Sequence, residues 1–206
     1  MNLQSLFPVT LSNHWHDAND CSLDENLKSW LLDPNSLTAR LKSHSHQFRV
    51  ELLGQRIESC QENEAVALIP SGEKILVREV LLFCDEKPQV FARSLLPLSS
   101  LTGAEQALAN LGTQSLGQVL FNNPSLERQT IELAEFDATS SVGKLAKQLS
   151  LSEQRHLSEQ CRPSPEKLWG RRSIFVLENK PLMVAEVFLP GAFAYQQIVN
   201  SRHKHA

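Results

Sequence analysis

Hydrophobic and polar positions alternate along the chain in a way that predicts short helices and strands. Near the N-terminus, apolar residues recur on one helical face: Leu23, Leu27, Trp30 and Leu31. Ser22 and Glu25 have the spacing of a capping box, so a helix is expected from about Ser22. Asp33-Pro34-Asn35 should end this helix, and Ser36 can cap a short second one.

Six later segments have the alternation or the apolar content of β-strands. They are residues 48–53, 75–84, 89–96, 127–133, 173–177 and 182–189. Turn-forming residues at 85–88 and 178–181 join four of these segments into two hairpins. Strands that pair mainly through hairpins predict an antiparallel sheet.

Between the first hairpin and residue 127 the pattern returns to helical spacing. Thr102 and Glu105 repeat the capping-box spacing before an apolar stripe that stops at Gly112, and a short helix follows through Leu116 and Leu120. We therefore expect an α+β fold with the helices on one side of the sheet. The chain should form a single domain over residues 1–206.

Residues 138–164 differ in composition from the rest. They are rich in Ser, Gln, Lys and Glu and end near two prolines, so they are expected to be a surface insertion. A partly amphipathic helix is predicted within it, around residues 145–157.

Composition restricts the class of protein and of partner. With 41% hydrophobic and 21% charged residues the chain resembles an ordinary globular protein, and its net charge of −3 favours neither nucleic acid nor anionic membranes as partners. The first ten residues lack the features of a signal peptide, and no apolar run could be inserted in a membrane. Four scattered cysteines without a Cys-x-x-Cys pair indicate reduced thiols and a cytoplasmic location.

Three charged residues fall on the apolar faces of predicted strands. Their neighbours two positions away are apolar: Leu76 and Val80 beside Arg78, Phe91 and Leu95 beside Arg93, and Val184 and Phe188 beside Glu186. An unpaired buried charge costs several kcal/mol, or about that order, so each of these residues needs a partner.

The first hairpin suggests what the partner is. If its turn has an even number of residues, position 78 faces position 95, and Arg78 and Arg93 emerge on the same side roughly 5–8 Å apart. A small ligand with two carboxylates would then join them. Two alternatives stay open: Arg78 could pair with Glu186 while Arg93 reaches the sheet edge, or an odd-length turn could separate the arginines.

Other candidate motifs are weaker. Three His-x-His pairs, at 14–16, 44–46 and 203–205, lack a third ligand at useful spacing, so no metal site is expected. Arg171-Arg172 could hold an anion or be exposed. No glycine-rich phosphate loop follows a strand, and no Gly-x-Ser-x-Gly motif occurs.

Several blocks in order resemble bacterial chorismate pyruvate-lyases. They are residues 77–82 (VREVLL), 92–99 (ARSLLPLS), 116–117 with 120–121, 168–173 (LWGRRS), 180–182 (KPL) and 186–190 (EVFLP), with 30–32 and 36–38 also similar. The resemblance covers about residues 23–190, except 138–164.

The resemblance implies an enclosed ligand site beneath helical flaps. It implies that Arg78 binds the ring carboxylate, that Glu186 meets the hydroxyl at the opposite end, and that Leu37 and Leu116 close over the ring. Leu37 stands where the family has methionine, a change that conserves volume. Arg93 is our own addition, because the second, enolpyruvyl carboxylate of the substrate needs a cation.

The implied activity is conversion of chorismate to 4-hydroxybenzoate and pyruvate, the first step of the ubiquinone ring pathway, by a monomer without a cofactor. Whether Glu186 acts as a base or only orients the hydroxyl stays open. The alternative is a non-catalytic, effector-sensing domain like those of some transcription regulators. Because the lyase-like region starts near residue 23, we expect no preceding DNA-binding domain. A structural or partner-binding role would require a pocket filled by side chains.

Overall fold

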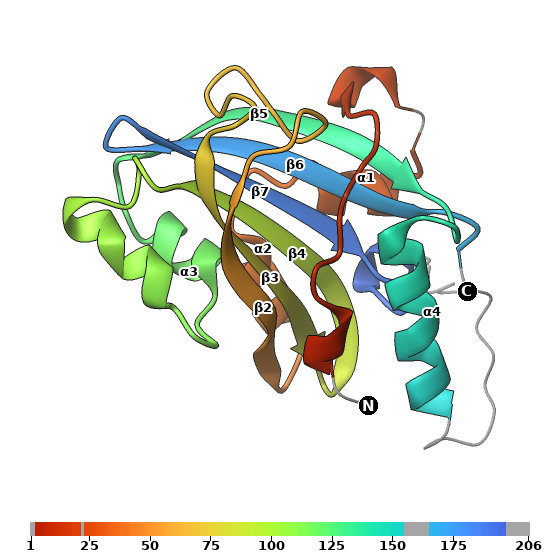
Figure 1. Cartoon of the computed structure of the whole chain (residues 1–206). Coiled ribbons are helices and arrows are strands. Elements are labelled where there is room, and N and C mark those ends of the chain that lie inside the picture. Colours follow the sequence, from red (N-terminus) through yellow and green to blue (C-terminus); the bar gives the residue numbers. More distant parts are fainter. Residues whose placement is uncertain (1–2, 22, 155–164, 197–206) are drawn as a thin grey trace, which may run out of the picture.

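A computed structural model describes residues 3–21, 23–154 and 165–196, which form one antiparallel sheet with helices packed on it (Figure 1). The seven strands follow the spatial order β1-β5-β6-β7-β4-β3-β2. Their bounds are β1 His16–Asp17, β2 Phe48–Ser59, β3 Lys74–Cys84, β4 Lys87–Pro97, β5 Leu126–Phe136, β6 Leu168–Leu177 and β7 Lys180–Phe188. The predicted α+β class with an antiparallel sheet is confirmed.

The helices are short, except for one. They are α1 Glu25–Leu31, α2 Leu37–Ser43, α3 Leu116–Phe121 and α4 Ser141–Gln154, with 3-10 turns at Leu3–Leu6, Ala18–Asp20, Gly103–Asn110 and Phe193–Tyr195. Ser36 caps α2 as predicted, since its Oγ accepts a hydrogen bond from the Ala39 N–H. Helix α1 is capped by Asp24, whose Oδ1 accepts from the Leu27 N–H. The predicted cap Ser22 lies outside the described residues.

Both predicted hairpins form, each with a tight two-residue turn. Asp85 and Glu86 have φ of 48° and 62°, and Glu178 and Asn179 have φ of 49° and 61°. Positive φ at both central residues matches the twist of the adjoining strands. In the first hairpin, Leu82 pairs with Val90 but Phe83 pairs with Pro88, so Gln89 is an extra residue in a bulge.

One face of the sheet, which we call the α1–α3 face, is covered by α1, α2 and α3. Apolar side chains of β3 and β4 on this face, such as Val80 and Ala92, cluster with Trp30, Leu37 and Leu41 from α1 and α2. Leu116 and Leu120 of α3 pack over the other end of the same face, against Leu76, Leu96 and Phe175. Helices α1, α2 and α3 thus cover one side, as predicted, but the prediction that all helices lie on that side is wrong, because α4 packs on the other face.

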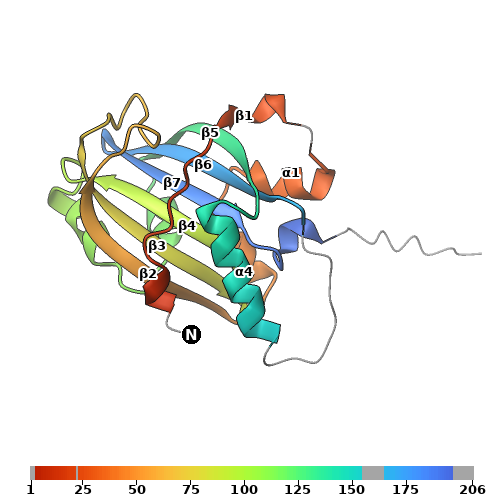
Figure 2. The same ribbon diagram turned by 45° about the vertical axis from the view of Figure 1, so that its right-hand side comes forward.

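The opposite face, which we call the α4 face, is covered by α4 and by the N-terminal segment, which lie across the sheet in Figure 2. Leu81, Phe91 and Val187 of the sheet cluster with buried side chains of α4 and the N-terminal segment: Val9, Leu11, Val142, Leu145, Ala146 and Leu149. The predicted helix in 138–164 is present as α4, but Val142, Leu145, Ala146 and Leu149 on one side of it are buried in the core, so this helix is not a mere surface insertion.

Two further segments differ from the prediction. Strand β2 does not end at Gly54 but continues to Ser59, past a register shift between Leu52 and Gly54. Residues 103–110 form a 3-10 helix, and Thr102 makes no side-chain cap bond there. Among helices of the described residues, none is long and apolar enough to cross a membrane.

Candidate functional site

The α1–α3 face carries a row of polar side chains across four strands. Arg78 of β3 pairs with Ser94 of β4, which pairs with Val184 of β7, which pairs with Ser173 of β6. Residues directly opposite in antiparallel strands point to the same side. Arg78, Ser94 and Ser173 therefore share this face, beneath the helices.

Glu186 lies in the neighbouring row of the same face. It pairs with Ala92 of β4 and with Arg171 of β6. Strands are about 4.8 Å apart and alternate residues advance about 7 Å, so the Cα atoms of Arg78 and Glu186 are separated by about 12 Å. The two candidate residues thus project from one face, with Ala92 and Ser94 of β4 between them.

Arg78 is a buried cation without an anionic partner among the described residues. The residue is 1% exposed, and its Nη2 donates to the carbonyl oxygens of Gly112 at 3.0 Å and Gln114 at 2.9 Å. Its Nε is buried with no hydrogen-bond partner. Burial lowers the pKa of Arg78 to about 10, so the side chain still carries its charge at neutral pH. An anion on this face would meet an unsatisfied donor.

Glu186 is held by Arg171 and not by Arg78, so the alternative pairing considered from the sequence is wrong. Arg171 Nε donates to Glu186 Oε2 at 2.7 Å. Its Nη1 donates to carbonyl oxygens at the end of α1, those of Trp30 at 3.4 Å, Leu31 at 3.3 Å and Asp33 at 3.0 Å. The Glu186 Oε1 atom accepts no hydrogen bond from the described residues. One carboxylate oxygen is fixed, and the other is available.

Helices α2 and α3 begin side by side above this face. Leu37 and Leu116 are their first residues, and both are buried. Ser115, the cap of α3, forms a buried hydrogen bond of 2.6 Å with Thr38 of α2. Because Gln114, which accepts from Arg78, directly precedes Ser115, the start of α3 is anchored beside the Arg78 guanidinium.

The predicted position of Arg93 beside Arg78 is wrong. The bulge at Gln89 shifts the register by one, so Arg93 pairs with Glu79 and projects to the α4 face. There its Nε and Nη2 donate to Glu64 at 2.7 and 2.9 Å, and its Nη1 donates to Glu79. The turn itself has two residues, so the odd-length turn left open by the sequence is wrong as well, and it is the bulge that separates the two arginines. Arg93 is fully paired, so we assign it no ligand.

Comparison with known proteins identifies the family. The sequence profile described as chorismate lyase matches residues 10–199. The chain belongs to the chorismate lyase family.

Relatives in this family are similar along nearly their whole length. A protein of Psychromonas ingrahamii named "probable chorismate pyruvate-lyase" is 42% identical over 192 residues, which cover 93% of this chain and 97% of the relative. A protein of the same name from Pseudoalteromonas translucida is 40% identical over 190 residues, covering 92% of this chain and 98% of the relative.

The crystal structure of PhnF from Mycobacterium smegmatis is similar with a TM-score of 0.50 at 17% identity, covering 77% of this chain and 65% of PhnF. That likeness concerns the fold alone.

The sequence analysis did not predict two polar residues of the α1–α3 face, Ser173 and Arg128. Ser173 is 1% exposed, and its Oγ is buried with no hydrogen-bond partner. Arg128 of β5 pairs with Phe175, because an extra residue at Gln129 shifts the register of β5. Without this bulge, Arg128 would share the α4 face with Glu132. Four buried side-chain atoms of the described residues lack a partner, and three of them are on the α1–α3 face: Arg78 Nε, Arg128 Nε and Ser173 Oγ.

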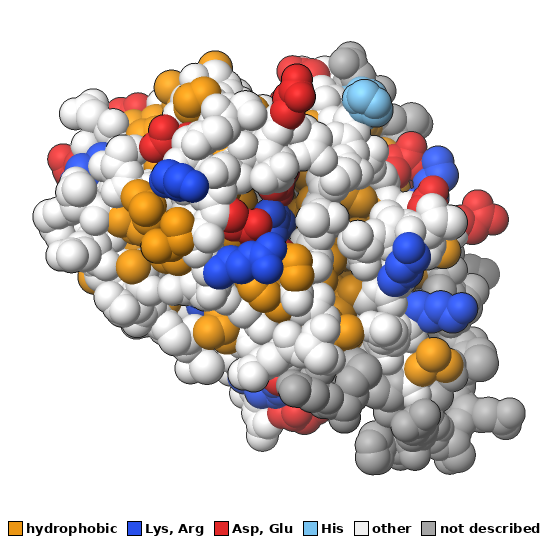
Figure 3. Space-filling view, viewed as in Figure 1, with side chains coloured by type: hydrophobic (Ala, Val, Ile, Leu, Met, Phe, Trp, Pro, Cys, Tyr) orange, Lys and Arg blue, Asp and Glu red, His pale blue; other side chains and the backbone are white. Residues whose placement is uncertain are grey.

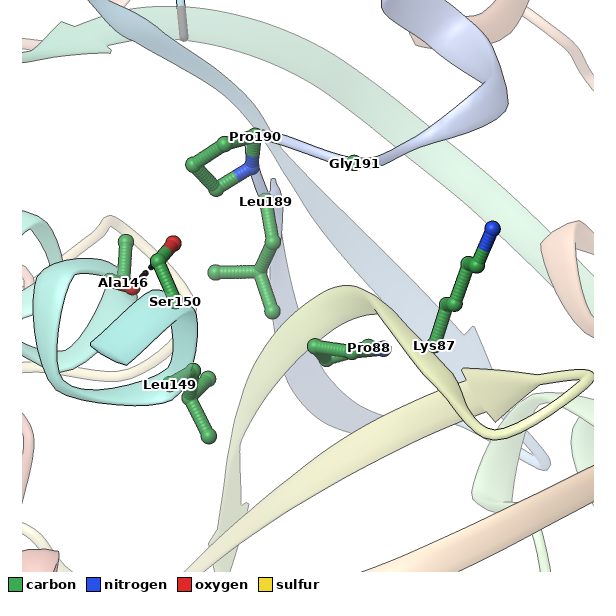
Figure 4. A pocket seen from close by; sticks show the side chains of 8 residues that line it. All are labelled: Lys87, Pro88, Ala146, Leu149, Ser150, Leu189, Pro190 and Gly191. Carbon is green, nitrogen blue, oxygen red and sulfur yellow. Dashed lines mark hydrogen bonds between the residues drawn. The ribbon is translucent and has the colours of Figure 1, made fainter. Parts of the chain in front are cut away.

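Two small pockets lie away from the α1–α3 face. The larger has a volume of about 40 Å³ and lies between α4 and the ends of β4 and β7, lined mainly by apolar groups such as Leu149 and Pro190 (Figure 4). The other is about 10 Å³ and lies beside Glu64 and Arg93. Both are far below the roughly 300 Å³ at which ligand pockets begin.

The surface offers no strong electrostatic patch in the view of Figure 3, where acidic and basic side chains are interspersed. Within the described residues, no group of three His, Cys, Asp or Glu side chains is placed to hold a metal ion. His203 and His205 lie outside the described residues.

Proposed function

We propose that this protein is a chorismate pyruvate-lyase, which converts chorismate into 4-hydroxybenzoate and pyruvate. Family membership and the names of its relatives support this assignment. The observation that carries it is Arg78, a buried cation with no carboxylate partner in the described part of the chain, on the same covered face as Glu186. A buried cation of this kind is stabilised by an anionic ligand.

The geometry suits a cyclic acid with a hydroxyl group opposite its carboxylate. The ring carboxylate binds Arg78, and the para hydroxyl reaches the free oxygen of Glu186. Leu37 and Leu116 cover the ring. They are the first residues of α2 and α3, where backbone N–H groups lack intrahelical acceptors and can donate to the same carboxylate.

Catalysis of this reaction depends mainly on how the protein positions the substrate. The ether bond at ring carbon C3 breaks, the hydrogen at C4 is lost, and the ring becomes aromatic. The enolpyruvyl group gains a hydrogen and leaves as pyruvate, so no electrons are exchanged with an outside acceptor and no cofactor is required. The protein holds the reactive ring conformer and stabilises the charge on the departing group.

Glu186 has two possible tasks in this reaction. As a base, it would take the C4 proton, and the released enolpyruvate would be protonated afterwards. As an orienting group, it would only accept the hydroxyl hydrogen bond while the C4 hydrogen passes within the substrate to the enolpyruvyl methylene. In both, the hydrogen bond from Arg171 Nε to Oε2 orients the carboxylate toward the hydroxyl.

We further propose that the enzyme is a cytoplasmic monomer that supplies the ring precursor of ubiquinone. Cys60 and Cys84 are buried thiols, which fits a reducing compartment. Of the large hydrophobic side chains in the described part of the chain, only Ile57, Leu68 and Leu151 are strongly exposed. Such a surface fits a monomer.

The test is incubation of purified protein with chorismate after treatment with a chelator. We expect 4-hydroxybenzoate, measured by chromatography, and pyruvate, measured with lactate dehydrogenase, in equal amounts. Arg78→Met serves as the variant that should abolish turnover at low substrate concentration. Tight binding of 4-hydroxybenzoate without any turnover would instead support the effector-sensing alternative.

A further inference from the structure

Arg128 is a second cation of the α1–α3 face without a carboxylate partner in the described residues. It extends from β5, and its guanidinium lies over the rings of Phe121 and Phe175, at 5.4 and 4.9 Å from their centroids. Its Nη1 donates a hydrogen bond to the Asp33 carbonyl oxygen at 3.0 Å. Its Nε is buried and has no partner.

The position of Arg128 is tied to that of Glu186. The Asp33 carbonyl oxygen accepts hydrogen bonds from both Arg128 and the Nη1 of Arg171. The Nε of Arg171 donates to Glu186. The two guanidinium groups therefore converge on one oxygen atom. Arg128, Phe121 and Phe175 mark the side of the site where β5 and β6 meet α3.

The charges at this end of the site do not cancel. Arg171 neutralises Glu186, and the Asp33 carboxylate pairs with Arg40. Arg128 is left as the additional positive charge, next to a second arginine that repels it. Burial and the Arg171 charge lower the pKa of Arg128 to about 10, which leaves it cationic at neutral pH. An anion bound here would reduce the repulsion between Arg128 and Arg171, and it would accept a hydrogen bond from the Arg128 Nε.

We infer that Arg128 binds the second carboxylate of the substrate, that of the enolpyruvyl group, and so distinguishes chorismate from the aromatic product. This inference rests on the proposed function. With the ring carboxylate on Arg78 and the C4 hydroxyl at Glu186, the substituent on the adjacent C3 atom lies at the Glu186 end of the ring, where Arg128 is. Arginine is suited to this task, because its planar donors match a carboxylate.

The same contact serves the reaction and the release of products. When the C3–O bond breaks, negative charge grows on the departing enolpyruvyl group, and Arg128 stabilises it. The product 4-hydroxybenzoate has no carboxylate for Arg128, so it keeps only the Arg78 and Glu186 contacts. Arg128 is therefore a determinant of substrate affinity and not of product affinity.

The test compares three aromatic ligands that need no turnover to be measured. They are 4-hydroxybenzoate, 3-methoxy-4-hydroxybenzoate, whose added group is neutral, and 3-carboxymethoxy-4-hydroxybenzoate, whose added group carries the second carboxylate. Calorimetry with the unaltered protein should show that the carboxymethoxy ligand binds more tightly than the methoxy ligand. Arg128→Gln should weaken the carboxymethoxy ligand about 10- to 100-fold and leave the other two nearly unchanged.

Two further variants separate a ligand contact from a structural role. Arg128→Lys keeps the charge but not the paired donors, so it should recover part of the lost affinity. Arg172→Gln is the matched control, because Arg172 is also buried beside an aromatic ring, Trp15, but is paired with Glu132 on the α4 face. It should leave the order of the three affinities unchanged. In kinetics, Arg128→Gln should raise the KM and lower the kcat for chorismate without changing inhibition by 4-hydroxybenzoate.

An equal loss for all three ligands in Arg128→Gln, no loss for the carboxymethoxy ligand, or no preference for that ligand in the unaltered protein would overturn the inference. These outcomes are distinct from failure of the proposed function. If the unaltered protein does not convert chorismate but Arg128 still selects the dianion, the lyase assignment fails and Arg128 remains a carboxylate site.

Discussion

The two faces of the sheet use the same residue type, buried arginine, in opposite ways. On the α4 face, Arg93 pairs with Glu64 and Glu79, and Arg172 pairs with Glu132. On the α1–α3 face, Arg171 pairs with Glu186, but Arg78 and Arg128 donate hydrogen bonds only to backbone carbonyl oxygens within the described residues. Burial alone therefore does not indicate a ligand; burial without a compensating anion does.

The pKa shifts express the same difference. Burial works to lower the pKa of Arg93, but the hydrogen bonds and charges of Glu64 and Glu79 outweigh it and raise that pKa. For Arg78, burial acts without such compensation and lowers the pKa to about 10. On the α4 face Arg93 has carboxylate partners within the fold, whereas Arg78 on the α1–α3 face has none among the described residues, and a carboxylate ligand could take that place.

The coverings of the two faces differ as well. The α4 face is closed by a 14-residue helix whose apolar side chains enter the core. The α1–α3 face is closed by helices of seven, seven and six residues. The starts of α2 and α3 are joined by the Thr38–Ser115 hydrogen bond, with Lys42 and Gln118 bonded nearby. A cover made of short helices is a candidate for local opening.

The largest expected effect is on the paired face. Arg93→Met would leave Glu64 and Glu79 as buried carboxylates without a counter-charge, so the free energy of unfolding should fall by about 3–5 kcal/mol. Urea denaturation measures this change. Glu86→Gln, which breaks only the exposed ion pair with Arg49, should cost at most about 1 kcal/mol. Equal losses in the two variants would contradict the structural role of Arg93.

The matching change on the other face should act on binding and not on folding. Arg78→Met leaves no carboxylate unpaired, so its effect on the free energy of unfolding should be smaller than that of Arg93→Met. Affinity for 4-hydroxybenzoate should fall by about 2–4 kcal/mol, measured by calorimetry. Unchanged affinity would remove Arg78 from the site and erase the distinction between the faces.

Glu186 sharpens the comparison of the two faces, because it is paired with Arg171 and yet lies on the α1–α3 face. Glu186→Gln keeps the shape and an acceptor for Arg171 Nε but removes the charge. We expect kcat to fall about 10- to 100-fold, with little change in the unfolding midpoint. If kcat stayed near its original value, Glu186 would have to be regarded as structural, like Glu64.

The smallest expected effect concerns the cover that α2 and α3 form over the α1–α3 face. If its opening limits product release, turnover should begin with a burst of 4-hydroxybenzoate and continue at a slower rate that this product inhibits. Thr38→Val removes the buried bond to Ser115, worth about 1 kcal/mol, so the steady rate should rise a few-fold. Rapid-quench kinetics measures both phases. Linear product formation from the first turnover, without product inhibition, would show that release is not limiting.

Much of the architecture follows from the sequence alone. Alternation along residues 75–84 and 182–189 predicted the strands that carry Arg78 and Glu186, and it put both charges on apolar faces. Turn-forming residues predicted both hairpins, and Ser36 marked the start of α2. Local patterns suffice for these features, because strand alternation and helix capping depend on residues close in the chain.

The tertiary structure decided which face each charge reaches. Side chains alternate with a period of two, so one extra residue moves every later side chain to the other face. The bulge at Gln89 sends Arg93 to the α4 face, and the bulge at Gln129 brings Arg128 to the α1–α3 face. Neither bulge is visible in the pattern of residues, because pairing between strands determines where the extra residue is accommodated. For the same reason, the partner of Glu186 and the burial of α4 could be known only once the strands and helices were packed together.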